Sequence, residues 1–183
     1  MKYQNTDKVP LIYLSSNTNK KCYVIRVADD FSGYTLVQTI DYGGSKLSDY
    51  NWCDYVVDLN CNYLYVYQKF GASADKIFKC KVLKFLLPSI SNQLTLQDTD
   101  ERGEYLINGA YVNQAVQIYG DKMYAICGLN GVDSPYELDV ADIGSGNVVT
   151  RLPLDWLGEP EGISFDAQGN MFISRNDIYK IEF

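Results

Sequence analysis

The feature that most constrains this fold is a succession of short apolar runs with turn residues between them. Examples are CYVIRV from Cys22, NYLYVYQKF from Asn62 and MYAICG from Met123, which are rich in Val, Ile, Tyr and Leu and are separated by Gly, Asn, Asp and Ser. Runs of this length bounded by turn residues are typical of β-strands, and apolar residues at helical spacing are scarce. The sequence therefore predicts an all-β chain of about fourteen strands.

One hairpin pattern recurs along the chain. The segments 53–68 and 161–176 align without a gap, which places Asp58 opposite Asp166 and Asn62 opposite Asn170, and a third copy begins at Gln114. The copies recur near the ~40 to 50 residues of a four-stranded propeller blade. We therefore expect residues 1–183 to form one domain, a β-propeller or propeller fragment of about three and a half to four blades of four-stranded antiparallel sheet.

This number of blades leaves the closure of the ring open. Propellers close with about 4 to 8 blades, because closure protects the strand edges. A four-bladed ring with one unrecognised strand, a piece of a longer propeller and two chains that complete one ring all fit the pattern. The strand pattern is weakest over residues 86–109, where we expect one strand from Leu94 and a polar insertion from Asp98 to Glu104.

Composition excludes several classes of function. The chain contains no histidine, which removes Ser-His-Asp and Cys-His catalysis and imidazole metal sites. The 16 Lys and Arg against 23 Asp and Glu give a net charge of -7, which disfavours nucleic-acid binding. The five cysteines form no C-x-x-C pair, so we expect reduced, mostly buried thiols. We find no signal-peptide pattern and no apolar run near the ~20 residues of a membrane span, and therefore expect no membrane insertion.

The C-terminal part of the sequence resembles a known propeller family. The segment EPEGISFDAQGNMFIS, from Glu159 to Ser174, looks like the blade signature of six-bladed propellers of the NHL, gluconolactonase and streptogramin-lyase type. Residues 113–183 are similar to the propeller domain of phage receptor-binding proteins and teichoic-acid-associated proteins. The resemblance implies a recognition module for a surface glycan or glycopolymer, in a virion-associated (phage tail) or extracellular setting.

The propeller prediction also indicates where a ligand would bind. The first strand of each blade begins near the central channel, so the starting residues of these strands converge on one surface. Here they are Cys53, Gln114 and Glu161, with Asp54 next along the chain. This cluster could hold a sugar hydroxyl or, through Asp54 and Glu161, a hard cation such as calcium. The same side chains could instead cap backbone groups. Trp52 and Trp156 precede two of these strands and could either rim the channel or fill contacts between blades.

We therefore predict a non-catalytic binding module without an obligatory cofactor, whose ligand is a bacterial surface carbohydrate. Sixteen tyrosines fit this prediction, because an aromatic ring stacks on the apolar face of a sugar while its hydroxyl hydrogen-bonds sugar oxygens. Two alternatives stay open. One is a metal-assisted lactonase-like or lyase-like enzyme that uses Glu161 and Asp54, and the other is a scaffold that binds proteins, as a homo-oligomer or as part of a longer chain.

Overall fold

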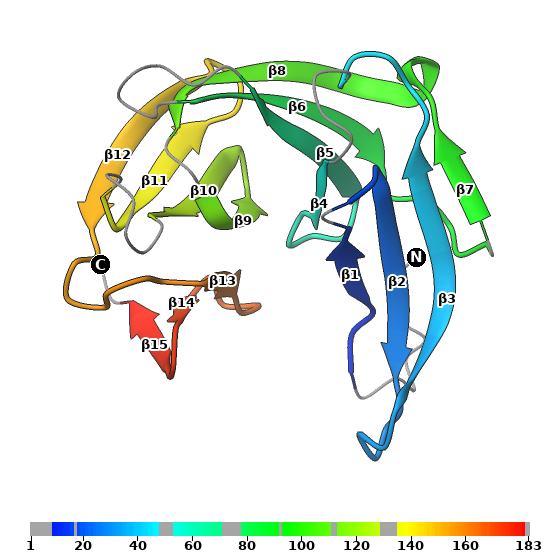
Figure 1. The fold of residues 1–183 in the computed structure, drawn as a ribbon, viewed down its shortest axis with the longest axis horizontal. Helices are drawn as coiled ribbons and strands as arrows, with labels where there is room; N and C mark the ends of the chain where they lie inside the picture. Colours follow the sequence, from blue (N-terminus) through cyan, green and yellow to red (C-terminus); the bar gives the residue numbers. More distant parts are fainter. Residues whose placement is uncertain are drawn as a thin grey trace. The chain divides into compact units, whose positions relative to one another are not determined.

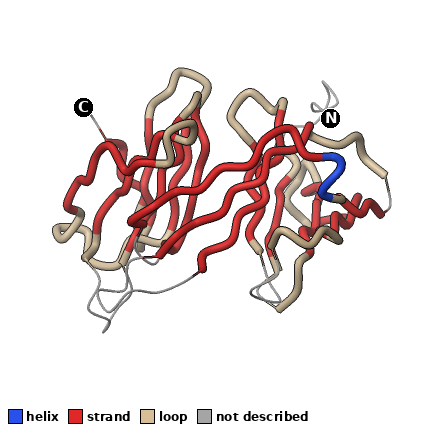
Figure 2. Tube along the Cα trace, turned by 90° about the horizontal axis from the view of Figure 1, so that it is seen from above, coloured by secondary structure: helices blue, strands red, loops and turns tan. Residues whose placement is uncertain are grey.

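The computed structural model describes residues 9–16, 18–47, 53–70, 78–91, 93–110, 113–128 and 135–181. Strands and turns account for nearly all of these residues, with one short 3-10 helix, η1 (Asp98–Asp100), so the all-β prediction is confirmed (Figure 2). The chain divides into two compact units. The first contains residues 1–68 and 82–104, and the second contains residues 69–81 and 105–183. The prediction of one domain stays a prediction.

The first unit contains two sheets. Strands of the first sheet follow the order β1-β2-β3-β7, and those of the second follow β4-β5-β6-β8, in which β5, β6 and β8 each continue into the other unit (Figure 1). The strands are β1 (Ile12–Ser15), β2 (Lys21–Val27), β3 (Tyr34–Tyr42), β4 (Asp54–Val57), β5 (Tyr63–Phe70), β6 (Phe78–Leu86), β7 (Gln93–Leu96) and β8 (Glu101–Ala110).

Alternation along these strands produces the core of the first unit. Successive side chains of a strand point to opposite faces, so Cys22 and Val24 of β2 are buried while their neighbours are half-exposed. They pack in one cluster with residues of the neighbouring strands and of the segments next to them, namely Ile40, Tyr42, Leu47, Cys53, Tyr55, Leu64, Val66, Leu83, Phe85 and Leu96. Burial raises the pKa of the Cys22 and Cys53 thiols to about 12. The thiols of this core are therefore neutral and unreactive as folded.

The second unit repeats the same construction. Strands β9 to β12 are hydrogen-bonded in chain order, and β12 also pairs in parallel with β8, so that these strands belong to one eight-stranded sheet in the order β4-β5-β6-β8-β12-β11-β10-β9 (Figure 1). Strands β13, β14 and β15 form a separate antiparallel sheet. Their bounds are β9 (Asn113–Tyr119), β10 (Lys122–Cys127), β11 (Glu137–Asp142), β12 (Asn147–Pro153), β13 (Gly162–Phe165), β14 (Met171–Ser174) and β15 (Ile178–Ile181). The two sheets share a core of Ile126, Leu138, Val140, Leu154, Leu157, Met171 and Ile173.

The predicted hairpin turns are present. The Asp166 carboxylate accepts hydrogen bonds from the backbone N–H groups of Gln168 and Asn170 and from the Asn170 side chain, at 2.9, 2.8 and 2.7 Å. Asp58 plays the same part in its own turn, where it accepts the N–H groups of Asn62 and Tyr63 at 2.9 and 2.7 Å. These bonds replace water around the turn backbone and fix its path.

The ungapped alignment of these two hairpins is wrong by one residue. Phe165 pairs with Met171 across five turn residues, whereas Val57 pairs with Leu64 across six. Both turns place a residue with positive φ three positions after the aspartate, Cys61 at 53° and Gly169 at 83°. A side chain that carries the turn can therefore recur while the turn length changes.

The stretch from residue 86 to 109 also differs from the prediction. Strand β7 pairs in parallel with β3, and the predicted polar insertion forms η1 and the start of β8, which lies beside β6. Lys46 contacts Glu101 and Glu104 through Nζ at 2.8 and 2.7 Å, so a cation from another segment compensates two of the charges of this strand. Charge pairing across segments is invisible in a local pattern of polar residues.

Candidate functional site

The predicted ligand-binding residues fall in different parts of the fold. Asp54 is the first residue of β4 in the first unit, whereas Gln114, Trp156 and Glu161 belong to the second unit. Trp52 lies outside the described residues. Convergence of Asp54 with the other three therefore stays a prediction.

Gln114 and Glu161 lie where two first strands begin. The Gln114 side-chain amide donates a hydrogen bond from Nε2 to Glu159 Oε1 at 2.8 Å, and the Glu161 N–H donates to the Ser174 carbonyl at 2.9 Å. At the other ends of β9 and β13, the rings of Tyr119 and Phe165 stack with centroids 5.1 Å apart. The two strands are therefore neighbours that run in the same direction, and their starts carry an amide and two carboxylates.

Trp156 is presented to solvent by the segment 154–161, which we call the 154–161 loop. Leu154 and Leu157 are buried in the core, and the loop is fixed by hydrogen bonds from the Leu154 N–H to the Tyr136 carbonyl and from Arg175 Nη1 to the Leu157 carbonyl, both at 2.7 Å. The Trp156 side chain is 63% exposed. Its ring meets that of Tyr179 nearly at a right angle, with centroids 5.6 Å apart.

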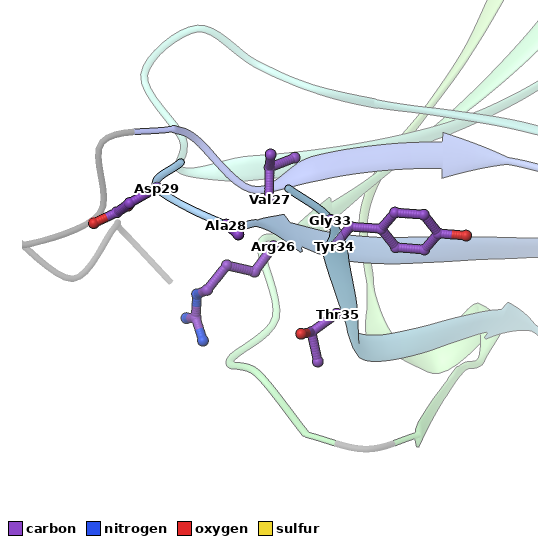
Figure 3. A pocket seen from close by; sticks show the side chains of 7 residues that line it. All are labelled: Arg26, Val27, Ala28, Asp29, Gly33, Tyr34 and Thr35. Atoms are coloured by element: carbon purple, nitrogen blue, oxygen red, sulfur yellow. The ribbon is translucent and has the colours of Figure 1, made fainter. Parts of the chain in front are cut away.

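A pocket that the sequence did not predict lies at the end of the β2–β3 hairpin in the first unit. It is open to solvent, has a volume of about 510 Å³, and is lined by Arg26, Val27, Ala28, Asp29, Gly33, Tyr34 and Thr35. Arg26 and Thr35 point to the same side of the hairpin and Val27 to the other (Figure 3). The turn is closed by the Ala28 N–H, which donates to the Gly33 carbonyl at 2.9 Å. The local sequence DDFSG indicates the turn but not the pocket.

A group of ionisable side chains, also unpredicted, lies on one face of the β10–β12 sheet. Glu137 and Asp139 are two residues apart on β11 and so share a face, and Arg151 pairs with Asp139 across β12. Arg151 Nε lies 3.0 Å from Asp139 Oδ1 and 3.4 Å from Glu137 Oε1. The Cys127 thiol, opposite Glu137 on β10, lies 3.7 Å from Asp139 Oδ2.

Burial, together with the negative charge of Asp139, raises the pKa of Glu137 to about 7, although Arg151 partly opposes the shift. A carboxyl with such a pKa can transfer protons near neutral pH. Asp139, however, is 1% exposed, and neither described pocket includes this group. The arrangement can store a proton inside the sheet, and the signal that could have predicted it is the Glu-x-Asp alternation in an otherwise apolar strand.

A second polar cluster holds the loop that follows β3. Asp98 accepts the Tyr42 hydroxyl at 2.5 Å through one carboxylate oxygen, and the N–H and hydroxyl of Ser45 at 2.9 Å through the other. Burial alone would raise the pKa of Asp98, but these hydrogen bonds lower it. A Cβ atom on Gly44 would overlap both the Asp98 carboxylate and the Tyr42 hydroxyl. The glycine pair at 43–44 therefore allows the loop to close on Asp98.

No family model matches the sequence, and no curated protein matches it. The resemblance to six-bladed propellers therefore stays a prediction. The described part of the chain contains no helix with the length and hydropathy of a membrane span. Among the same residues, no three Cys, Asp or Glu side chains are grouped so that they could hold a metal ion.

Proposed function

We propose that the sheets of this chain are blades of a β-propeller and that the protein is a non-catalytic module that binds a bacterial surface carbohydrate. Three features support blades. Strands β9 to β12 and β13 to β15 follow the up-and-down order of a blade, the sheets of the second unit pack face to face, and β9 and β13 lie side by side with their starts together. Two strands depart from this scheme: β7 pairs in parallel with β3, and β8 pairs with both β6 and β12, which joins β4 to β6 and β9 to β12 into one eight-stranded sheet.

The observation that carries the proposal is that the exposed ring of Trp156 lies on the same loop as Glu159, whose carboxylate is hydrogen-bonded by Gln114. A sugar stacks its apolar face on an aromatic ring and hydrogen-bonds to amides and carboxylates with its hydroxyls. Trp156 offers the ring, and Gln114 and Glu159 offer hydrogen-bonding groups that already orient each other. Glu159 is three positions after Trp156, so their Cα atoms lie at most ~11 Å apart, a distance that an oligosaccharide can cover.

The 154–161 loop is held in place before any ligand arrives. Its two leucines are buried and its carbonyl at Leu157 is fixed by Arg175. A site that is already ordered loses little conformational entropy on binding, which favours weak polar ligands such as sugars. The pocket in Figure 3 also offers an exposed tyrosine and an arginine. Its lining side chains do not share one face, because Arg26 and Val27 point to opposite sides of the hairpin, so we place the sugar site at Trp156 instead.

The proposal is tested by binding to an array of glycans and cell-wall glycopolymers from Gram-positive bacteria. We expect Trp156→Ala to weaken binding about tenfold or more, because a lost ring contact of ~1.4 kcal/mol corresponds to a factor of ten. Gln114→Ala should weaken it less. Phe31→Ala, which removes an equally exposed ring from the first unit, is the matched control and should bind like the wild type.

A chelator separates this proposal from a metal-dependent one. We propose that binding needs no cofactor, since the amide and carboxylates can contact sugar hydroxyls directly. Binding should therefore survive EDTA. Retained binding in Trp156→Ala, or the same loss in Phe31→Ala, would overturn the proposed site. A loss of binding in EDTA that calcium restores would replace it with a calcium site.

A further inference from the structure

The outer face of β1, β2 and β3, opposite the core of the first unit, is apolar and exposed. Ile12, Ile25 and Leu36 lie directly across from one another on the three strands, and Leu14 pairs with Tyr23 beside them. Leu14 is 45% exposed and Leu36 is 53% exposed. Large apolar side chains gathered on neighbouring strands in solvent are typical of an interaction surface rather than of scattered surface residues. We call these five residues the protruding face.

The outer face of β13, β14 and β15 is hollow where the protruding face carries large side chains. Gly162, Ser164 and Ser174 are small residues on neighbouring positions of β13 and β14, and Phe172 and Ile178 stand beside them. They line a hollow of about 230 Å³, and Ile178 is 75% exposed at its edge. The hollow arises because Gly162 lies opposite Ser174, where a Cβ atom would meet the Ser174 hydroxyl. We call this surface the hollow face.

We propose that a second copy of this chain covers the protruding face with its hollow face, in a head-to-tail contact. The chain itself carries both halves of this contact: large aliphatic side chains that project from one sheet, and an apolar hollow with small residues on another. Sheets inside each unit already pack face to face through side chains of the same types. The contact would extend that mode of packing from within the chain to between two copies.

The size of the two faces sets the strength of the contact. A face of three strands, each four to nine residues long, covers on the order of 200 to 300 Å² in flat area. A standard stable interface buries ~800 Å² on each partner. We therefore expect association that depends on concentration, in the micromolar range or weaker, and not a permanent dimer. Because the two faces differ, the contact is heterologous, and it either closes a ring or grows into a chain of copies.

Sedimentation of the full chain from about 1 μM to about 500 μM tests the proposal. The wild-type average mass should rise with concentration. Leu36→Lys places a charge on the protruding face, and Ser164→Arg fills the hollow face, so each variant alone should associate about tenfold more weakly or not at all. Val149→Lys changes a residue that is 53% exposed on β12, a strand that contributes to neither face, and should associate like the wild type.

Mixing the two variants is the decisive measurement. Leu36→Lys keeps an intact hollow face and Ser164→Arg keeps an intact protruding face, so an equimolar mixture should form dimers and nothing larger. Circular dichroism and thermal melting establish that both variants are folded. A wild type that stays monomeric over the whole range would overturn the proposal. So would association that Ser164→Arg leaves unchanged, or a mixture of folded variants that forms no dimer.

Discussion

At the scale of single residues, the surroundings of Glu137 change its proton affinity in a way that a titration of stability against pH can measure. It is 9% exposed, lies beside Asp139 on the same strand, and shares Arg151 with it. Two carboxyls that share one guanidinium inside a sheet keep one proton more readily than two separate carboxyls do. The chain contains no histidine, so no imidazole obscures a titration between pH 5 and 8.

We expect the free energy of unfolding to fall as pH rises from about 4.5 to about 7, and then to level off. Between these values the unfolded chain has lost the proton of Glu137 while the folded protein still binds it, so each added pH unit favours unfolding by at most ~1.4 kcal/mol. Urea unfolding of the wild type and of Glu137→Gln at several pH values measures this slope.

In Glu137→Gln the decline over this pH range should disappear, because an amide does not titrate. Asp177→Asn removes an exposed carboxyl that does not act on Glu137 and is the control, which should keep the wild-type slope. If the wild type and Glu137→Gln respond to pH in the same way, the proton lies elsewhere.

At the scale of elements, the sequence predicted the hairpin turns best and the polar loops worst. Asp58 and Asp166 indicated their hairpins in the sequence, because the hydrogen bonds that fix such a turn join residues two to five positions apart. The loop after β3 is held by Asp98, more than fifty positions away in the sequence. The glycine pair in this loop is needed because a Cβ atom there would overlap the Asp98 carboxylate, a contact that the local sequence does not reveal. The sequence predicted that pair as an ordinary loop for this reason.

Substitution of the two glycines on either side of β3 should separate packing from backbone freedom. Gly44→Ala should destabilise the protein by about 2 kcal/mol or more, because its methyl group displaces Asp98 from Tyr42 and leaves the buried Tyr42 hydroxyl without its partner. Gly33→Ala meets nothing within 4 Å and should be neutral or stabilising by up to ~1 kcal/mol. Equal melting temperatures for the two variants would contradict the role of Asp98.

At the scale of the whole molecule, the sequence predicted the all-β class of the fold and the antiparallel succession of neighbouring strands, but not the pairing of β12 with β8. Local alternation and turn chemistry are sufficient for antiparallel strands that follow one another, such as β9 to β12. They were insufficient for β7 and β8, whose partners are distant in sequence, and for the Glu137 group, which forms only when three strands align. Of the residues in the proposed site, the sequence indicated Gln114 and Trp156 but not Glu159, because a side-chain pair between a strand and a distant loop has no local pattern.

Net charge provides a test of self-association that involves no substitution. Every copy carries a net charge of -7, so two copies repel each other, while the faces proposed to meet are apolar. Raising NaCl from about 50 mM to about 500 mM should screen the repulsion and strengthen association. Association that weakens with salt would point to ion pairs rather than to the protruding and hollow faces.

The division into units has a consequence for how the protein can be made. Each unit takes residues from two separate stretches: 82–104 completes the first, and the second begins with 69–81. No single cut of the chain yields both units intact as independent fragments. During translation the first unit remains incomplete until residue 104 has been synthesised. By then residues 69–81 of the second unit have been made, but residues 105–183, which form the rest of that unit, have not.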